Sequence, residues 1–320
     1  MKLLVTGAAG FIGSNYVNDL VLRDSQWSEI VLLDVLSYAG NLNNLELSLR
    51  DKRVKFIKSD IRNTELVNEI MAKVDGVVHF AAESHVDRSI DHPEDFISTN
   101  VLGTFTLLKS AYEHEVDFFL NVSTDEVYGS IESGSWSELS PLAPNSPYSA
   151  SKASADLIAL AYWKTFGFPV FISRCSNNFG AFQFPEKFIS LAITNLIDGI
   201  PIPVYGNGLN SRDWLHVSDH CNALNNIISN GKPGEIYNIG GGTELSNLDL
   251  AKLLIKESGR DESYIQFVED RKGHDFRYSV DFSKIVNTCG YSPKSTFIES
   301  IKETVDWYTK NETWWRSLKK

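Results

Sequence analysis

The chain has 320 residues, of which 42% are hydrophobic and 22% charged, and its formal net charge at pH 7 is -11. Such a composition is typical of a globular protein with enough apolar material for one large domain or two moderate ones. The acidic balance argues against nonspecific binding to nucleic acid or to an acidic membrane surface, because no basic surplus is available to neutralise phosphates. A nucleotide held by a few well-placed side chains remains compatible with this charge.

The cysteines and the amino terminus indicate in which cellular compartment the protein is located. Cys175, Cys221 and Cys289 are widely spaced and lack the Cys-x-x-Cys pairing of metal sites, so we expect reduced, buried thiols and no metal. Residues 1–6 lead straight into a glycine loop without a signal-peptide pattern, and no apolar run reaches membrane-spanning length. These features predict a cytoplasmic protein with neither a membrane nor a nucleic-acid partner.

Short apolar runs alternate with helix-like stretches through the first half of the chain. The runs are rich in Val, Ile, Leu and Phe without polar alternation, which is typical of strands buried on both faces of a parallel sheet. Strands are predicted at residues 2–5, 29–33, 54–57, 76–80, 118–122 and 170–173. Helices are predicted at residues 12–23, 65–73, 93–114 and 147–166, the last two opened by a proline. This order predicts an α/β fold with a Rossmann-like, doubly wound parallel sheet.

After about residue 175 the pattern becomes irregular. Loops at 177–185 and 206–212 surround a helix beginning at Lys187, and short strands are expected near 202–204 and 236–239. Large loops beside a doubly wound sheet are where an enzyme builds its substrate specificity. We therefore predict a dinucleotide-binding domain at 1–178, which also receives segments from about 213–240, and a smaller, loop-rich substrate domain mainly at 179–320.

Glycines at a three-residue spacing follow the first predicted strand and open the first predicted helix. They are Gly7, Gly10 and Gly13, with Phe11 and Ile12 between the last two. Glycine permits a tight turn there and lets backbone amides approach a pyrophosphate, which the positive end of the helix also attracts. Without the flanking strand and helix, the triplet would indicate only a turn. In this context it predicts a dinucleotide cofactor site.

An acidic residue, Asp34, closes the second strand 21 residues after Gly13. An acid at this position hydrogen-bonds the ribose hydroxyls of the adenosine. NAD is preferred over NADP because the carboxylate would repel a 2′-phosphate, and residues 35–37 offer no arginine to receive one. An ordinary strand-end acid is the alternative. Asp60 and Ile61, after the third strand, could similarly cap the adenine, although a turn aspartate fits almost as well.

Tyr148 and Lys152 lie four residues apart on a predicted helix and therefore share one face. Tyrosine titrates near pH 10, so a neighbouring ammonium and a nicotinamide cation would have to lower its pKa before it could act as a base near neutrality. The Tyr-x-x-x-Lys pattern alone arises often by chance on amphipathic helices. Its position after a nucleotide fold favours a redox dyad.

Two adjacent carboxylates, Asp125 and Glu126, follow Thr124 just past the fifth predicted strand. This is the edge of the sheet where ligands of such folds bind. Both carboxylates can face one ligand only if the chain has already bent, because successive strand side chains point to opposite faces. The alternative is a helix amino-terminal cap built from Thr124 or Asp125. A dehydrogenase needs no extra acid and base, whereas an enzyme that also eliminates water needs both.

Over its whole length the sequence resembles the extended short-chain dehydrogenase/reductase family, and within it the dTDP-glucose 4,6-dehydratases. The discriminating motif is Thr124-Asp125-Glu126, because sugar epimerases of similar fold differ there. The resemblance rests on residues 7–13, 81–89, 124–129, 148 with 152, 174–178, 185–187, 212–214 and 270–278. It implies an NAD-dependent nucleotide-sugar 4,6-dehydratase, a hydro-lyase that forms a 4-keto-6-deoxy sugar from dTDP-glucose.

The resemblance also implies roles for the reacting residues. Tyr148 removes the proton of the sugar 4-hydroxyl while NAD accepts the C4 hydride, and Thr124 helps to hold the oxygen. Glu126 then removes the C5 proton and Asp125 protonates the departing 6-hydroxyl, after which the hydride returns to C6. For Asp125 to act as an acid, burial and the adjacent Glu126 must raise its pKa well above about 3.9.

By the same resemblance, residues along the whole chain would bind the two ligands. Beside the glycine loop and Asp34, those for NAD are Ser37, Asp60, Ile61, Ala81, Ala82, Ser84, Thr99, Tyr148, Lys152 and Asn178. Those for dTDP-glucose are Ser84, His85, Thr124, Asn177, Lys187, Tyr205, Arg212, Asn247, Arg271, His274 and Tyr278. A diphosphate calls for arginine and lysine in an acidic protein, although any one of these cations could instead form a surface salt bridge.

Other interpretations stay open at this point. A related epimerase, decarboxylase or dehydratase acting on UDP- or GDP-sugars would need the same NAD site and the same Tyr148 and Lys152. Such an enzyme would have less use for the carboxylates Asp125 and Glu126. A non-catalytic NAD-sensing protein would need no base. The helices at 93–114 and 147–166 could pair across a twofold axis, so a homodimer is expected, although an apolar helix face is as often buried within one subunit.

Overall fold

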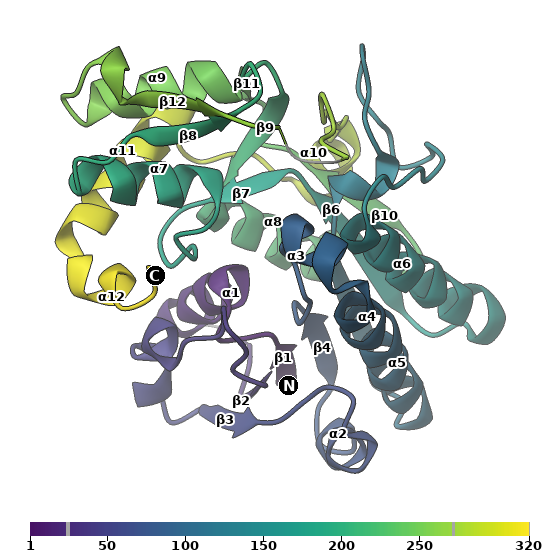
Figure 1. Ribbon diagram of the computed structural model, residues 1–320. Helices are drawn as coiled ribbons and strands as arrows, with labels where there is room; N and C mark the ends of the chain where they lie inside the picture. The colour runs from purple at the N-terminus through teal and green to yellow at the C-terminus, as the bar shows by residue number, and fades with distance from the viewer. Residues whose placement is uncertain (24–25, 271–272, 320) are drawn as a thin grey trace.

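A sheet of seven parallel strands forms the centre of the computed structural model, which describes residues 1–23, 26–270 and 273–319. The strand order is β10-β6-β5-β4-β1-β2-β3 (Figure 1). The strands are β1 (Lys2–Thr6), β2 (Glu29–Asp34), β3 (Val54–Lys58), β4 (Gly76–His79), β5 (Phe118–Thr124), β6 (Val170–Cys175) and β10 (Ile236–Ile239). The chain winds outward from β1 to β3 and then returns to β4 on the other side of β1. This reversal creates the crevice in which ligands of doubly wound sheets bind.

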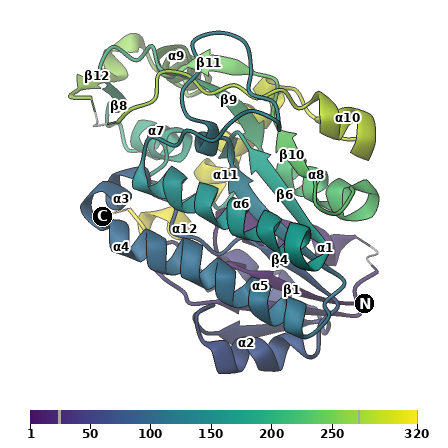
Figure 2. The same cartoon turned by 90° about the vertical axis from the view of Figure 1, so that its right-hand side faces the viewer.

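Helices cover both faces of this sheet, which confirms the predicted fold class. Neighbouring residues of β1 point into different cores: Leu3 and Val5 into one, Leu4 into the other. The first core includes side chains of α1 (Phe11–Leu22), α8 (Val217–Asn230) and α10 (Ser283–Cys289). The second includes side chains of α2 (Thr64–Met71), α5 (Thr104–Glu113) and α6 (Pro147–Phe166). Figure 2 shows α5 and α6 side by side in front of the sheet.

The helix predicted at 93–114 is confirmed as a continuous helical stretch from Pro93 to Glu113, but it contains a π-helical segment that was not predicted. The structure has α4 (Pro93–Phe96), a π-helical segment η3 (Ile97–Gly103) and α5. Within η3 the amide of Asn100 accepts from the Glu83 backbone N at 2.8 Å and donates to the Glu83 carbonyl at 2.9 Å. It also donates to the Ser151 hydroxyl at 2.8 Å. The π-helical segment thereby holds the loop after β4 against α6, as such segments often do near functional sites.

The carboxyl-terminal part builds two small sheets with helices around them, in the upper part of Figure 1. Strands β7 (Asn177–Phe179), β9 (Ser211–His216) and β11 (Glu244–Ser246) form one sheet, and β8 (Ile202–Tyr205) and β12 (Ile265–Val268) the other. The accompanying helices are α7 (Phe188–Ile197), α9 (Asn247–Glu257), α11 (Phe297–Lys310) and α12 (Glu312–Arg316). They share a separate apolar core that includes Ile193, Leu254 and Trp315.

Short elements complete the description. They are α3 (Val86–Asp91), η1 (Leu42–Leu45), η2 (Ser48–Arg50), η4 (Asp125–Tyr128) and η5 (Glu262–Tyr264). β10 lies late in the chain but pairs with β6 in the large sheet. The domain boundary at residue 178 stays a prediction. Among the described residues, no helix combines the length and apolarity needed to span a membrane.

Candidate active site

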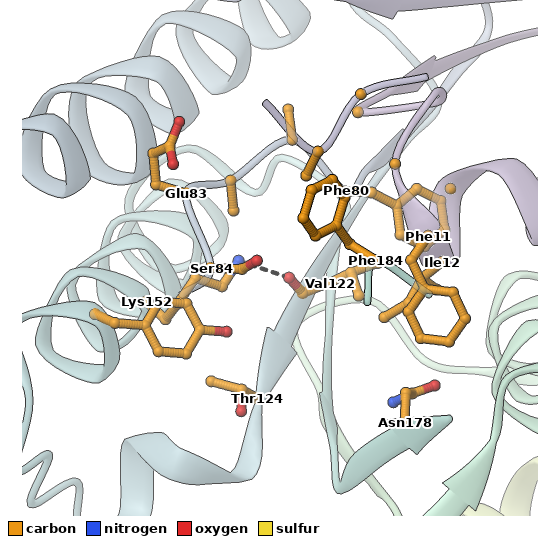
Figure 3. A pocket seen from close by; sticks show the side chains of 18 of the residues that line it. Phe11, Ile12, Phe80, Glu83, Ser84, Val122, Thr124, Lys152, Asn178 and Phe184 are labelled. Atoms are coloured by element: carbon orange, nitrogen blue, oxygen red, sulfur yellow. Dashed lines mark hydrogen bonds between the residues drawn. The ribbon is translucent and has the colours of Figure 1, made fainter. Parts of the chain in front are cut away.

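A cavity of about 550 Å³ lies at the carboxyl ends of the central strands, where the sheet order reverses (Figure 3). This volume is in the range of ligand and cofactor sites. Figure 3 shows Phe11, Ile12 and Phe184 on one side of the pocket, with Lys152 and Thr124 on the other. Every residue predicted to bind NAD contributes to the wall: Gly7, Gly10, Phe11, Ile12, Gly13, Asp34, Ser37, Asp60, Ile61, Ala81, Ala82, Ser84, Thr99, Tyr148, Lys152 and Asn178.

The glycine loop leaves no room for side chains. Gly7 has φ +67°, and a Cβ atom there would lie 2.5 Å from the backbone N of Ala81. A Cβ atom on Gly13 would lie 2.3 Å from the carbonyl oxygen of Gly7. The loop therefore packs tightly and delivers the amino terminus of α1, with Gly10 as its first flanking residue, to the cavity. Such a terminus presents unpaired N–H groups that suit a pyrophosphate.

Asp34 is buried at the end of β2 and its carboxylate accepts two backbone hydrogen bonds. They come from the N–H of Ala9 at 2.9 Å and of Leu36 at 2.7 Å. Burial raises the pKa of Asp34, and the two amides oppose that rise. Each carboxylate oxygen accepts one of these bonds and can accept another, and Asp34 lines the cavity. The loop and this acid together fit a dinucleotide with free ribose hydroxyls.

The chain bends immediately after β5, as two cavity-facing carboxylates require. η4 begins at Asp125, and both Asp125 and Glu126 line the cavity. The Thr124 hydroxyl accepts from the N–H of Glu126 at 3.3 Å and donates to Asp125 Oδ1 at 3.3 Å. The same hydroxyl is hydrogen-bonded with Tyr148. Thr124 therefore caps the turn that begins at Asp125 and also lines the cavity, so both interpretations of the sequence apply.

Asp125 is 2% exposed and has the properties of a neutral acid. Burial raises its pKa well above the usual range, and the charges of Glu126 and Asp213 add to this, while Arg212 opposes it. Its Oδ2 atom has no hydrogen-bond partner within the described part of the chain. The direction of the shift agrees with the sequence-based expectation. A carboxyl group whose pKa is raised in this way donates a proton at a higher pH than an ordinary aspartic acid does.

Tyr148 and Lys152 both lie on α6, which begins with Pro147 and a capping box between Ser146 and Ser149. Lys152 is 4% exposed, and its Nζ donates to the carbonyl oxygen of Val122 at 2.7 Å, the dashed line in Figure 3. Burial lowers the pKa of Lys152, and the nearby carboxylate of Asp156 opposes this. The helix therefore presents both residues of the dyad to the cavity, with the lysine anchored to β5.

In the protein alone the pKa of Tyr148 is raised; the lowering expected from Lys152 together with a nicotinamide cation stays a prediction. Burial is the main cause, and the charges of Glu126 and Asp125 contribute, whereas the Thr124 hydrogen bond opposes the rise. The protein by itself keeps Tyr148 as a phenol.

The predicted substrate residues fall into two groups. Ser84, Thr124, Asn177 and Lys187 line the cavity, and Asn177 Oδ1 is buried without a partner among the described residues. The residues His85, Tyr205, Arg212, Asn247, His274 and Tyr278 do not line it. Arg271 lies outside the described residues.

Four residues of the second group contact one another in pairs, and two of them interact electrostatically with the reacting carboxylates. Arg212 donates to the carbonyl oxygens of Ser211 at 2.7 Å and Asp275 at 2.8 Å, and its guanidinium lies 4.4 Å from the ring centre of Tyr278. The rings of Tyr205 and His274 are 6.0 Å apart. The charge of Arg212 lowers the pKa of Asp125, and the charge of Glu126 raises the pKa of Tyr278. An ionic group bound beside Arg212 would therefore lie next to the reacting carboxylates.

Several cavity residues were missed from the sequence. Arg62 follows β3 and forms a salt bridge with Asp60 at 2.5 Å, so an arginine does lie near the predicted adenosine site, but it is paired. Cys175 accepts a hydrogen bond from Asn178 at 3.3 Å, and burial raises its pKa to about 12. Glu186 belongs to the 185–187 motif but was not itself predicted as a site residue, and Phe184 precedes that motif. No local signal identifies these residues, because the fold brings them to the cavity.

Comparison with known proteins places the chain among nucleotide-sugar enzymes. The family model described as GDP-mannose 4,6 dehydratase matches residues 4–304. A dTDP-glucose 4,6-dehydratase from Streptomyces antibioticus is 54% identical over 324 aligned positions, which cover 100% of this chain and 96% of the relative.

Two solved structures of high similarity have the same name. DesIV, a dTDP-glucose 4,6-dehydratase from Streptomyces venezuelae with NAD and TYD bound, is 51% identical, with a TM-score of 0.98 and 100% of both chains covered. The dTDP-glucose 4,6-dehydratase from Bacillus anthracis in complex with NAD is 46% identical, with a TM-score of 0.93 and the same complete coverage. The sequence and the fold therefore indicate the same group of enzymes.

Proposed function

This chain belongs to the dTDP-glucose 4,6-dehydratase family, and from that membership and the site geometry we propose that it is an NAD-dependent hydro-lyase converting dTDP-glucose to dTDP-4-keto-6-deoxyglucose. The observation that carries this proposal is the buried acid Asp125 next to Glu126, on a turn that also holds Thr124 against Tyr148. An oxidation alone would leave these two carboxylates without a task.

NAD is the cofactor of this reaction: it accepts the C4 hydride of the sugar and gives it back at C6. The glycine loop would hold its pyrophosphate and Asp34 its ribose hydroxyls, as their geometry fits these groups. Asn178 would also contact it, since it lines the same cavity. Asp34 favours NAD over NADP, and Asp60 keeps Arg62 engaged in a salt bridge.

Tyr148 starts the reaction by taking the proton of the 4-hydroxyl, with Thr124 hydrogen-bonded beside it. The raised pKa of the phenol means that cationic charge must be brought near it before it can accept a proton. The C4 ketone acidifies the C5 hydrogen. Glu126 then removes the C5 proton, and Asp125 protonates the 6-hydroxyl so that it leaves as water.

The nucleotide end of the substrate would extend from the cavity toward β9 and β12. Asn177 and Lys187 line the cavity, and Arg212, Asn247, His274 and Tyr278 come from the elements beyond it. We assign these residues, with Ser84, His85, Tyr205 and Arg271, to the sugar, the diphosphate and the deoxythymidine of dTDP-glucose. An arginine fixed by backbone carbonyls, as Arg212 is, is preorganised to bind a phosphate.

The protein is further proposed to be a cytoplasmic homodimer. Apolar side chains remain exposed along η3, α5 and α6: Ile97, Leu102, Phe105, Tyr112, Leu157 and Phe166. Exposed apolar side chains on adjacent helical segments favour a protein interface there. The three buried free cysteines suit a reducing compartment.

The test is NMR spectroscopy of the purified protein with NAD and dTDP-glucose in deuterated buffer. We expect a 4-keto-6-deoxy sugar with solvent deuterium at C5 and the original C4 hydrogen at C6. Unchanged dTDP-glucose, together with turnover of a UDP- or GDP-sugar, would instead assign the site to a different nucleotide sugar.

A further inference from the structure

Three loops that are distant in the sequence meet at one side of the active-site cavity. Residues 35–41 follow β2, residues 84–88 follow β4 and enter α3, and residues 183–187 lie between β7 and α7. Each of these loops supplies cavity wall, at Ser37, Ser84 and Glu186 for example. The first loop belongs to the predicted cofactor site and the third to the predicted substrate site.

Tyr38 joins these loops through both ends of its side chain. Its hydroxyl donates to Glu186 Oε1 at 3.1 Å. On the ring, the guanidinium of Arg88 lies 3.8 Å from the centroid, and the ring of Phe184 packs edge-on at 5.6 Å. Burial and the charge of Glu186 raise the pKa of Tyr38, so its hydroxyl stays protonated and able to donate. Glu186 lines the cavity, Tyr38 lies between Glu186 and Arg88, and Arg88 is exposed.

A second connection runs parallel to the first. Lys187 Nζ donates to the carbonyl oxygen of Ser84 at 3.1 Å, and His85 Nε2 lies 3.8 Å from Glu186 Oε2. The loop after β4 and the segment before α7 are thus connected next to the Tyr38 contacts. Opening the cavity at this side would require all of these contacts to separate.

We propose that Tyr38, Arg88 and Glu186 form a bridge between the loops at one side of the cavity, and that this bridge retains NAD through repeated turnovers. This inference rests on the proposed function, in which NAD returns to its oxidised form in each cycle and need not leave. An enzyme that exchanged its cofactor in every turnover would be slowed by such a bridge. Tyr38, Arg88 and Glu186 are positioning residues, because they act on the cofactor by holding the surrounding loops together.

The test measures the exchange of bound radiolabelled NAD from the holoenzyme into excess unlabelled NAD. Tyr38→Phe keeps the ring under Arg88 and removes only the hydroxyl bonded to Glu186. Because that bond is made to a charged group, we expect NAD to dissociate about tenfold faster. Tyr264→Phe is the matched control, because Tyr264 forms a Tyr–Arg pair with Arg260 and does not line the cavity. It should leave the dissociation rate unchanged.

Glu186→Ala, alone and combined with Tyr38→Phe, shows whether Glu186 and Tyr38 act together on the release of NAD. If Glu186 works through Tyr38, the double variant should release NAD no faster than Glu186→Ala alone. Additive effects would assign Glu186 a separate contact with the ligand and overturn the bridge, as would an unchanged dissociation rate in Tyr38→Phe. The exchange assay needs no sugar substrate. A protein that retains NAD through the bridge but leaves dTDP-glucose unchanged would refute the proposed function alone.

Discussion

The ammonium of Lys152 donates a hydrogen bond to the carbonyl oxygen of Val122 at 2.7 Å, two residues before Thr124 on β5. The bond joins the catalytic helix α6 to the strand that carries the reacting turn. It therefore fixes Tyr148, one turn earlier on α6, opposite Thr124, with which the phenol is hydrogen-bonded. The lysine in this structure positions the tyrosine more directly than it shifts the tyrosine pKa.

Tyr148→Phe should stop the first oxidation. The variant keeps the ring beside Phe96 but removes the group that takes the 4-hydroxyl proton, so NADH formation should slow about 10²- to 10⁴-fold. Stopped-flow absorbance after mixing with dTDP-glucose measures this step. Tyr162→Phe, on the same helix but outside the cavity wall, is the control and should react like wild type. Normal NADH formation in Tyr148→Phe would exclude the assigned base.

Asp125→Asn and Glu126→Gln should allow oxidation but slow elimination. Both substitutions keep the size of the side chain while removing the acid that releases water or the base that removes the C5 proton. Enzyme-bound NADH should therefore accumulate during turnover, and its decay should be at least about 10²-fold slower than in wild type. If neither variant forms NADH any faster than Tyr148→Phe does, the division into separate steps is wrong.

The stability of the protein should reveal the raised pKa of Asp125. The folded protein binds this proton more tightly than the unfolded chain, so the ionised group costs stability as pH rises from about 3.9 through its folded pKa. Asp125→Asn removes that cost, which is about 1.4 kcal/mol for each unit by which the pKa is raised. Thermal unfolding should show the variant more stable than wild type at pH 8 but not at pH 4. A difference that is equal at both pH values would contradict the raised pKa.

The sequence allows the framework of this site to be predicted because its signals are local. Continuous apolar runs identify β1 to β6, and the spacing from Gly7 to Asp34 identifies the cofactor loop. The position of Asp125 and Glu126 just past the fifth predicted strand, together with the resemblance to the dehydratases, favours an acid–base pair over a helix cap. These features depend on neighbours in the chain, and the fold retains them.

Features created by long-range contacts could not be predicted in this way. The π-helical segment η3 depends on Asn100 meeting Glu83 and Ser151, which lie 17 and 51 residues away. The direction of the Tyr148 pKa depends on its burial and on the carboxylates opposite it. A local sequence pattern contains no information about neighbours that are distant in the sequence.

Asp34→Asn should weaken NAD binding and reduce the preference over NADP. The amide can still accept from one backbone N–H, but it loses the charge that suits ribose hydroxyls and repels a 2′-phosphate. We expect NAD affinity to fall by about 1.5–3 kcal/mol, the range for a hydrogen bond to a charged group. Titration calorimetry with both cofactors measures this. Equal losses for NAD and NADP would show that Asp34 acts on the loop structure alone.

Leu157→Glu should disrupt the proposed homodimer. Leu157 lies on α6 and is 57% exposed, in the apolar surface shared with Leu102 and Phe105. A carboxylate buried at a twofold interface would face its own symmetry copy, and both desolvation and like charge oppose that. Sedimentation velocity over a concentration series should show a dimer for wild type and a monomer for the variant. Leu139→Glu is the matched control, because Leu139 is 97% exposed and lies on a loop outside η3, α5 and α6. If both variants sediment like wild type, the apolar surface is not the subunit interface, and a monomeric wild type would exclude the homodimer itself.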